Sequence, residues 1–275
     1  MTDDLHAAIV GAVRDAAREH ILPRFRNLRP DDVGTKSGPQ DLVTLADTLA
    51  ERAMTAALAA ALPDALIVGE EAIAADPTLR DRIGEAETCV ILDPVDGTWN
   101  FAKGLPLFGV IAAVTSRGRP VAGMLHDPVV DDWVWTKAGG GAVLERPDGA
   151  SRPLRVSEAT DIGAITGYVP AGLFGAATRI RLVEALQEVP RIHTLRCSCH
   201  EYRMLAQGHV EFCLSGPEPH PWDHAAGTLA VREAGGVARM LDGSDYHAGV
   251  RRGVILSANS EVVWAEVAER VGFLI

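Results

Sequence analysis

The stretch Cys89-Val-Ile-Leu-Asp-Pro-Val-Asp-Gly-Thr98 carries most of the fold prediction. Its first four residues form an apolar run typical of a buried strand. The run stops at Asp93, and Pro94 restricts the backbone so that we expect a turn to follow. That turn brings Asp93 and Asp96, three positions apart, toward one point. Two carboxylates directly after a buried strand therefore predict a binding site at the edge of a sheet.

The chemistry of this stretch suits a cation and an anion together. Hard divalent cations prefer oxygen ligands, and magnesium requires nearly octahedral oxygen geometry with some waters retained. Gly97 and Thr98 begin a new segment, whose free N–H groups can receive an anion. Carboxylates beside such N–H groups are what metal-assisted phosphate hydrolysis requires.

Acidic residues also follow apolar runs or open helices at three other places. Taken singly, each has a structural explanation, either as a solvated turn residue or as a helix cap. Together with the 89–98 stretch they form a constellation of carboxylates near strand ends. These residues are Glu70 and Glu71 after the run 65–69, Asp223 after Trp222, and the pair Asp41 and Asp47.

The hydrophobic pattern alternates between helical and strand periods along the chain. It predicts helices at 5–28, 43–62, 174–188, 199–207, 223–234 and 260–271, and a polar loop at 29–40. It predicts strands at 65–69, 89–92, 107–115, 120–127, 132–137, 210–215, 236–241 and 252–257. This mixture indicates the α+β class, with layered sheets covered by helices. The polar segment 146–161 is the expected junction between two halves, 1–150 and 151–275.

Composition limits the classes of function. The 275 residues include 26 Lys and Arg against 37 Asp and Glu, a net charge of −11, which argues against a nucleic-acid partner. No apolar run approaches the roughly 18 residues of a membrane span. Residues 1–10 are acidic and lack a signal pattern, so we expect a cytoplasmic protein. The cysteines lack the spacing of a zinc site or a disulfide framework and are expected to be free thiols: Cys89, Cys197, Cys199 and Cys213.

Three motifs in order give the chain a resemblance to a known family. They are Gly69-Glu-Glu71, Asp93-Pro-Val-Asp-Gly-Thr98 followed by Asn100-Phe101, and Trp222-Asp-His-Ala-Ala-Gly227. The sequence resembles the inositol monophosphatase family, which belongs to the lithium-sensitive, magnesium-dependent phosphatases that also include fructose-1,6-bisphosphatases. Lys36 and the segment 41–47 are similar to the upstream element of that family. The resemblance covers residues 30 to 260 and implies a layered α-β-α-β-α sandwich.

The resemblance also implies residue roles and two or three magnesium ions. One ion would be held by Glu70, Asp93 and the Val95 carbonyl, and a second by Asp93, Asp96 and Asp223. Glu71 would help position a water on a more weakly bound third ion. Thr98 and Asp47 would form a pair that orients the attacking water, and the N–H groups of Gly97 and Thr98 would receive the phosphate. On this view residues 1–150 carry most metal ligands, and 151–275 contribute Asp223 and the substrate pocket.

The substrate pocket departs from the family pattern at two places. Relatives that prefer inositol phosphate carry a Glu before the Trp-Asp motif, and here that slot falls on Ser215 or Gly216. The usual Gly-Ser-Ala-Ala stretch is replaced by the segment 196–202. We therefore expect the substrate pocket to use Ser198, Ser215, Glu218 and His220.

The resemblance implies hydrolysis of a small phosphate monoester, such as inositol 1-phosphate or a related polyol or sugar phosphate. Histidinol-phosphate phosphatase is the alternative, since relatives with that activity share these motifs. A non-catalytic regulatory binding protein of the same fold is a third interpretation, and its mark would be a broken metal set. Relatives are commonly dimers, so a homodimer is expected.

Overall fold

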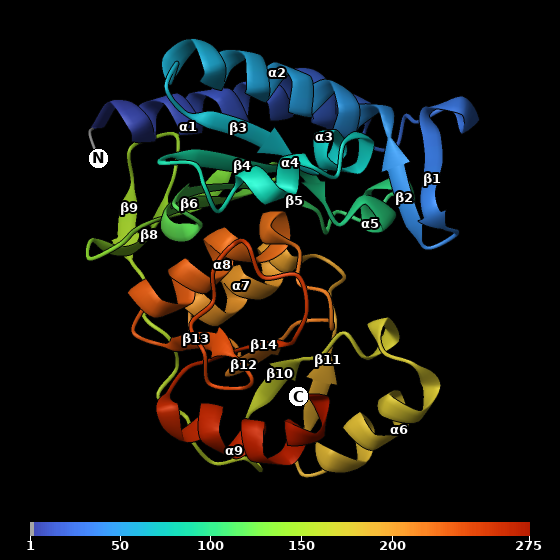
Figure 1. The fold of residues 1–275 in the computed structure, drawn as a ribbon, viewed down its shortest axis with the longest axis vertical. Coiled ribbons are helices and arrows are strands. Elements are labelled where there is room, and N and C mark those ends of the chain that lie inside the picture. The colour runs from blue at the N-terminus through green and yellow to red at the C-terminus, as the bar shows by residue number, and fades with distance from the viewer. Residues whose placement is uncertain (1–2) are drawn as a thin grey trace.

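The structure, a computed structural model, describes residues 3–275. Five layers are stacked along its long axis, as Figure 1 shows: a helix pair, a sheet, a second helix pair, a smaller sheet and a third helix pair. This arrangement confirms the predicted α+β class and the α-β-α-β-α order. None of the helices in the described residues is long and apolar enough to cross a membrane.

The helices fall into three layers and a few short connections. The outer pair at one end is α1 (Asp3–Ala16) and α2 (Leu45–Ala61), the central pair is α7 (Ser198–Ala206) and α8 (Pro221–Glu233), and the pair at the other end is α6 (Ala176–Ala185) and α9 (Glu261–Val271). Shorter helices are α3 (Glu70–Ala75), α4 (Leu79–Arg82) and α5 (Thr98–Ala102).

The larger sheet has seven strands in the order β3-β4-β5-β6-β7-β8-β9. Only its first pair is parallel; every other pair is antiparallel. Its members are β3 (Leu66–Gly69), β4 (Cys89–Asp96), β5 (Gly109–Ser116), β6 (Arg119–Asp127), β7 (Asp132–Lys137), β8 (Gly141–Glu145) and β9 (Ser151–Pro153). Because β9 pairs with β8, this sheet extends past residue 150.

The smaller sheet has five strands in the order β11-β10-β12-β14-β13. They are β10 (Thr166–Tyr168), β11 (Arg191–His193), β12 (Phe212–Leu214), β13 (Val237–Met240) and β14 (Ile255–Ala258). The three parallel strands of this sheet are joined through α6 and α7, whereas β13 and β14 pair antiparallel. The strands predicted at 210–215, 236–241 and 252–257 are thus present, and the sequence pattern missed β10 and β11.

Three predicted boundaries were wrong. The first helix ends its regular turns at Ala16 and continues only through a π turn and a 3-10 turn to Arg24, since Pro23 cannot extend it. The expected loop at 29–40 contains β1 (Val33–Gly38), which pairs with β2 (Asp41–Thr44) in a two-stranded hairpin. The strand predicted to stop at residue 92 runs to Asp96, because a bulge accommodates Pro94.

Helix α8 packs between the two sheets with very little clearance. Ten of its residues are buried, and most of these are small or apolar. Ala226 lies so close to Gly123 of β6 that a Cβ at Gly123 would stand 2.7 Å from the Ala226 Cβ. The close approach places the first turn of α8 beside the end of β4.

This packing yields a stability prediction. Gly123→Ala should lower the free energy of unfolding by about 1–3 kcal/mol, because the neighbouring atoms include α8 backbone and cannot yield easily. The melting temperature should fall by about 2–4 °C for each kcal/mol.

The matched control is Gly11→Ala on the exposed side of α1, where a new Cβ would meet nothing within 4 Å. That change should raise the melting temperature slightly, since alanine favours helix. Equal effects of the two substitutions would contradict the tight packing of α8.

Candidate active site

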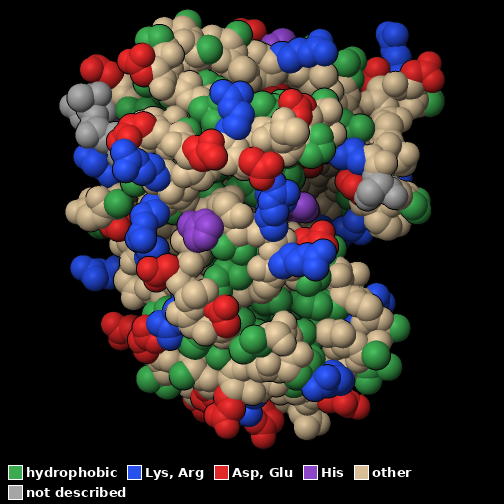
Figure 2. Space-filling view, in the orientation of Figure 1, with side chains coloured by type: hydrophobic (Ala, Val, Ile, Leu, Met, Phe, Trp, Pro, Cys, Tyr) green, Lys and Arg blue, Asp and Glu red, His purple; other side chains and the backbone are tan. Residues whose placement is uncertain are grey.

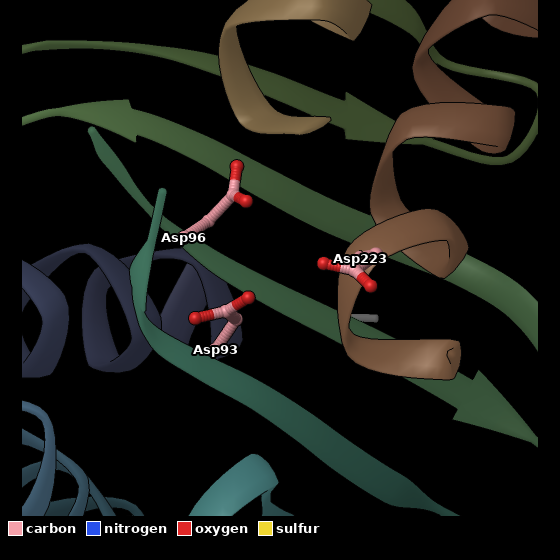
Figure 3. A group of neighbouring side chains, drawn as sticks. All are labelled: Asp93, Asp96 and Asp223. Atoms are coloured by element: carbon pink, nitrogen blue, oxygen red, sulfur yellow. The ribbon is translucent and has the colours of Figure 1, made fainter. Parts of the chain in front are cut away.

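Three aspartates converge where β4 ends and α8 begins. Carboxylate oxygens of Asp93, Asp96 and Asp223 all lie within 4.8 Å of one another. Figure 3 shows the first two projecting from the end of β4 and the third projecting toward them from the first turn of α8. The structure thus brings together three residues that are up to 130 positions apart in the sequence.

The bulge in β4 explains why Asp93 and Asp96 share one site. Asp93 pairs with Ile111 and Asp96 pairs with Gly109, so β4 has one more residue over this stretch than its partner β5. The Val95 N–H donates to the Asp93 Oδ1 at 3.1 Å and closes the bend. The strand therefore changes direction at Pro94 and Val95, and both carboxylates lie near that of Asp223.

Gly97 forms the hinge between β4 and α5. Its φ of +87° lies in the left-handed region, which favours glycine. A Cβ there would also stand 2.9 Å from the Leu107 carbonyl oxygen. The residue that follows, Thr98, is the first of α5, and both residues line the same cavity as the three aspartates. Their predicted role in binding phosphate, as a phosphate cradle, stays a prediction.

The predicted pair of Thr98 and Asp47 is present. The Thr98 hydroxyl lies 3.2 Å from the Asp47 Oδ1 and 2.9 Å from the Val95 carbonyl oxygen. Asp47 is completely buried in the first turn of α2, and its Oδ2 accepts hydrogen bonds from the N–H and hydroxyl of Thr44. One hydroxyl proton thus faces two acceptors, and Asp47 is anchored independently of Thr98.

Glu70 and Glu71 open α3 directly after β3, as the sequence placed them. The Lys36 ammonium from the β1–β2 hairpin lies 2.6 Å from a carboxylate oxygen of each. The buried Glu51 of α2 accepts the backbone N–H groups of Glu71 and Ala72, both at 2.8 Å. Glu51 therefore fixes the start of α3, and with it the direction of both acidic side chains.

Asp96 also accepts a hydrogen bond from the N-terminus of α7, a helix of the central layer. Its Oδ2 accepts the Cys199 N–H at 2.5 Å, at the N-terminus of α7, and lies 3.1 Å from the Cys197 sulfur. Gly109 permits this, since a Cβ on it would stand 2.4 Å from the Cys199 sulfur. The altered segment 196–202 thus supports Asp96 and borders the pocket.

The aspartates form one wall of a cavity of about 780 Å³ that opens between the two sheets. In Figure 2 the surface is indented at this level, on the side where Figure 1 draws β1, β2 and α6, with acidic and basic side chains around it. The four residues predicted for the substrate pocket all line the cavity: Ser198, Ser215, Glu218 and His220.

These four residues differ in how free they are to meet a ligand. The buried Ser215 donates to the Gly216 carbonyl oxygen and accepts from the Ile255 N–H, both at 2.8 Å, so the fold already uses its hydroxyl. Glu218 is exposed. His220 stacks on Trp222 with ring centroids 4.7 Å apart, and burial lowers its pKa, so the ring is neutral at pH 7.

The site contains residues that the sequence patterns did not single out. Besides Glu51, they include Glu201 and Arg196, which line the cavity or its rim. A signal for Glu51 existed, because it lies four positions after Asp47 on the buried face of a helix. His224 also lines the cavity but is buried: its Nδ1 lies 3.1 Å from the Tyr202 hydroxyl, and burial lowers its pKa to about 3.

The aspartate cluster is electrostatically unfavourable without a cation. Burial, together with the charges of Glu70 and the other aspartates, raises the pKa of Asp93 and of Asp223 well above the ordinary value. Burial also raises the pKa of Asp96 to about 6, and that of Asp47 to about 7. A divalent cation would remove this repulsion, and carboxylate oxygens at this spacing are the ligands that a hard cation prefers. The donor set therefore fits magnesium.

Comparison with known proteins places this geometry in a family. The model of the inositol monophosphatase family matches residues 1–271. The chain belongs to the inositol monophosphatase family. The match confirms the resemblance seen in the motifs and makes the chain a phosphoric monoester hydrolase.

Relatives of the family have similar length. The chain is 33% identical over 212 residues to an inositol-1-monophosphatase from Mesorhizobium japonicum, covering 75% of this chain and 74% of that one. It is 32% identical over 270 residues to the Nus factor SuhB of Escherichia coli, covering 96% of both. A solved IMPase from Thermotoga maritima superposes with a TM-score of 0.82, at 24% identity, over 99% of this chain and 98% of that one.

The raised pKa of Asp96 predicts a pH-dependent stability difference in metal-free protein. A carboxyl group whose folded pKa is raised destabilises the fold once pH exceeds its unfolded value of 3.8, and the penalty is complete above the folded value of about 6. In chelator, Asp96→Asn should therefore unfold at a higher temperature than the unmodified chain. The gain should be larger at pH 7.5 than at pH 5, by about 1 kcal/mol.

Differential scanning fluorimetry in EDTA at both pH values measures this difference. Asp64→Asn, which changes an exposed carboxylate, is the control and should show no pH-dependent gain. A gain for Asp96→Asn that is the same at both pH values would contradict the raised pKa.

Proposed function

We propose that the protein hydrolyses a small phosphate monoester with two or three magnesium ions held by its carboxylates. The observation that carries the proposal is the meeting of Asp93, Asp96 and Asp223 within 4.8 Å, beside the N–H groups of Gly97 and Thr98. When bound, magnesium supplies Lewis acidity and neutralises phosphate charge.

The residues divide into a cation-binding set and a substrate-binding set. Glu70, Asp93 and the Val95 carbonyl suit one ion, and Asp96 and Asp223 complete a site for a second, with Asp93 shared. Glu71 is held at 2.6 Å by Lys36 and lies where it could position water for a third, weaker site. The N–H groups at Gly97 and Thr98 would bind a phosphate oxygen, since the first N–H groups of a helix have no partner within that helix.

Thr98 and Asp47 orient the attacking water. With its proton directed to Asp47 at 3.2 Å, the Thr98 oxygen accepts a hydrogen bond from water and turns a lone pair of that water toward phosphorus. Burial raises the pKa of Asp47 to about 7, so the carboxylate is a competent proton acceptor near neutral pH. No covalent phosphoenzyme is needed, because water attacks in line with the leaving oxygen.

The leaving group would lie in the cavity between the sheets, among residues that differ from those of inositol-selective relatives. Ser215 and Gly216 stand where a hydroxyl-binding acid is expected, and neither offers a free carboxylate. The proposed substrates follow from the family: inositol 1-phosphate and related polyol or sugar phosphates, with histidinol phosphate as the alternative. The missing acid bears only on how strongly the enzyme discriminates among them.

A regulatory role is the second candidate. It is favoured by one observation, the 32% identity over 96% of the chain to a relative named Nus factor SuhB. A chain kept only for binding would not need the whole set of carboxylates, and this sequence retains each of them. We therefore rank hydrolysis first, as an activity of a cytoplasmic homodimer.

The metal assignment predicts that Asp93→Asn reduces kcat by about a thousandfold or more while the fold survives. Asp93 would serve two cations, and a neutral amide is a poorer ligand; a loss of several kcal/mol in the barrier corresponds to that factor. The measurement is phosphate release at saturating magnesium, with circular dichroism to verify folding. Asp64→Asn should behave like the unmodified chain. If a tenth of the activity survives in Asp93→Asn, the bridging assignment is wrong.

The pocket predicts modest discrimination among leaving groups that carry no second anionic group. A site with a dedicated hydroxyl partner strongly rejects analogues that lack the hydroxyl, whereas a site without one discriminates little. Values of kcat/KM for inositol 1-phosphate, glycerol 2-phosphate and histidinol phosphate should agree within about a hundredfold, under roughly 3 kcal/mol. A ten-thousandfold preference for one of them would point to a dedicated pocket built from other residues.

A further inference from the structure

Arg196 is a basic residue at the rim of the proposed active site, and in the described part of the chain it forms no ion pair with a carboxylate. Its side chain lines the same cavity as the three aspartates. Among residues 3–275, the cavity is lined by two basic residues with long side chains, Lys36 and Arg196. Lys36 is engaged by Glu70 and Glu71, whereas the hydrogen bond of the Arg196 guanidinium goes to the neutral amide of Gln40, at 3.2 Å.

We propose that Arg196 binds a second anionic group on the substrate, so that the enzyme prefers phosphate monoesters carrying an additional carboxylate or phosphate. This inference rests on the proposed phosphatase function and assigns a specificity residue to it. It is argued from three features of Arg196: its fixed backbone, its stacked side chain and its place beside the phosphate cradle.

The backbone of Arg196 is held from several sides. Its φ of +54° lies in the left-handed region, which side-chain-bearing residues adopt rarely. Below it, the buried Glu201 accepts the Leu195 N–H at 2.7 Å, and the Thr194 hydroxyl accepts the Arg196 N–H at 3.1 Å. The strained conformation is thus maintained by surrounding contacts, which is common where a side chain is positioned for function.

The side chain of Arg196 is prearranged as well. The guanidinium carbon lies 4.2 Å from the ring centroid of Trp99, so one face of the guanidinium is covered by the indole. Its Nη1 donates one hydrogen bond to Gln40, and a guanidinium carries five N–H donors in all. A planar fork of donors matches carboxylate and phosphate oxygens, which it binds through two hydrogen bonds.

Arg196 also adjoins the phosphate cradle. A Cβ on Gly97 would lie 3.3 Å from the Arg196 carbonyl oxygen, and Trp99 directly follows Thr98 in α5. An ester whose phosphate sits on the N–H groups of Gly97 and Thr98 would therefore carry its remaining atoms past this guanidinium.

The charge of the cavity gives the arrangement a selective effect. Acidic side chains outnumber Lys and Arg in the lining, and one of them, Glu218, is exposed. A second anionic group would be repelled there unless a cation met it, whereas a neutral polyol would gain little from Arg196. The preference should therefore be confined to substrates with a second negative charge.

Two matched substrate pairs test the proposal. Glycerol 2-phosphate and 2-phosphoglycerate differ by one carboxylate, and fructose 1-phosphate and fructose 1,6-bisphosphate differ by one phosphate. In the unmodified enzyme with magnesium, kcat/KM should be about tenfold higher for the doubly anionic member of at least one pair, a difference of about 1.4 kcal/mol. The pair that shows the preference identifies which group Arg196 binds.

Arg196→Gln should abolish that preference, mainly through KM, and leave the neutral member within about twofold. Arg196→Lys should give an intermediate preference, since it keeps the charge and loses the planar fork. Arg252→Gln removes an exposed arginine that does not line the cavity and should change nothing. Melting temperatures measured on the same samples show whether each variant is folded.

Equal losses on both members of a pair, or a preference that survives in Arg196→Gln, would overturn this inference alone. If the unmodified enzyme hydrolyses the neutral esters and shows no preference in either pair, the inference is likewise wrong and the proposed function stands. Absence of phosphate release from all four esters would overturn both.

Discussion

Repulsion among buried carboxylates is the constraint on which the rest of this structure depends. Asp93 and Asp96 are 2% and 6% exposed, and Asp223 faces them from another element. Such a cluster of carboxylates makes the free energy of folding less favourable, because burial and like charge both oppose ionisation. The surrounding structure must therefore hold it together by packing that does not depend on the carboxylates, so that the fold exists before a cation binds.

The middle helix layer supplies that packing. Helix α8 brings Asp223 into the site by approaching the larger sheet closely, which small residues allow where Gly123 faces Ala226. It also packs closely on α7, since a Cβ on Gly227 would stand 2.1 Å from the Tyr202 ring. On the sheet side, β4 is buried along its whole length. The apolar surfaces of α8 and of the larger sheet pack together and hold the acidic groups at their common edge, where the cavity is open to solvent.

The strand and helix that hold the acidic groups could be predicted from the sequence, because each depends on a local pattern. The buried run 89–92, the acidic residues that follow it and the helix after Trp222 are all readable from short windows. The bulge that carries β4 to Asp96 was missed, because proline signals a turn locally and only the pairing with β5 shows that the strand continues. Glu51 and Arg196 were missed for a related reason. Their roles arise from contacts with α3, and with Trp99 and Gln40, which no single window contains.

The division between a rigid centre and a variable rim explains how this chain can keep one chemistry and change its substrate. The carboxylates are placed by β4, α3 and α8, where a shift of one residue would disturb a sheet or a buried helix. The rim is built from connections: the β1–β2 hairpin, the turn before α7 and the segment before α8. Turns tolerate substitution because they place few atoms in the core. Here the turn leads directly into the α7 N-terminus, where the Cys199 N–H donates to Asp96, while Arg196 in the turn extends over Trp99. A substitution in that turn can therefore change substrate specificity without harming the metal site only if it does not move the α7 N-terminus. Replacing the side chain of Arg196 meets that condition.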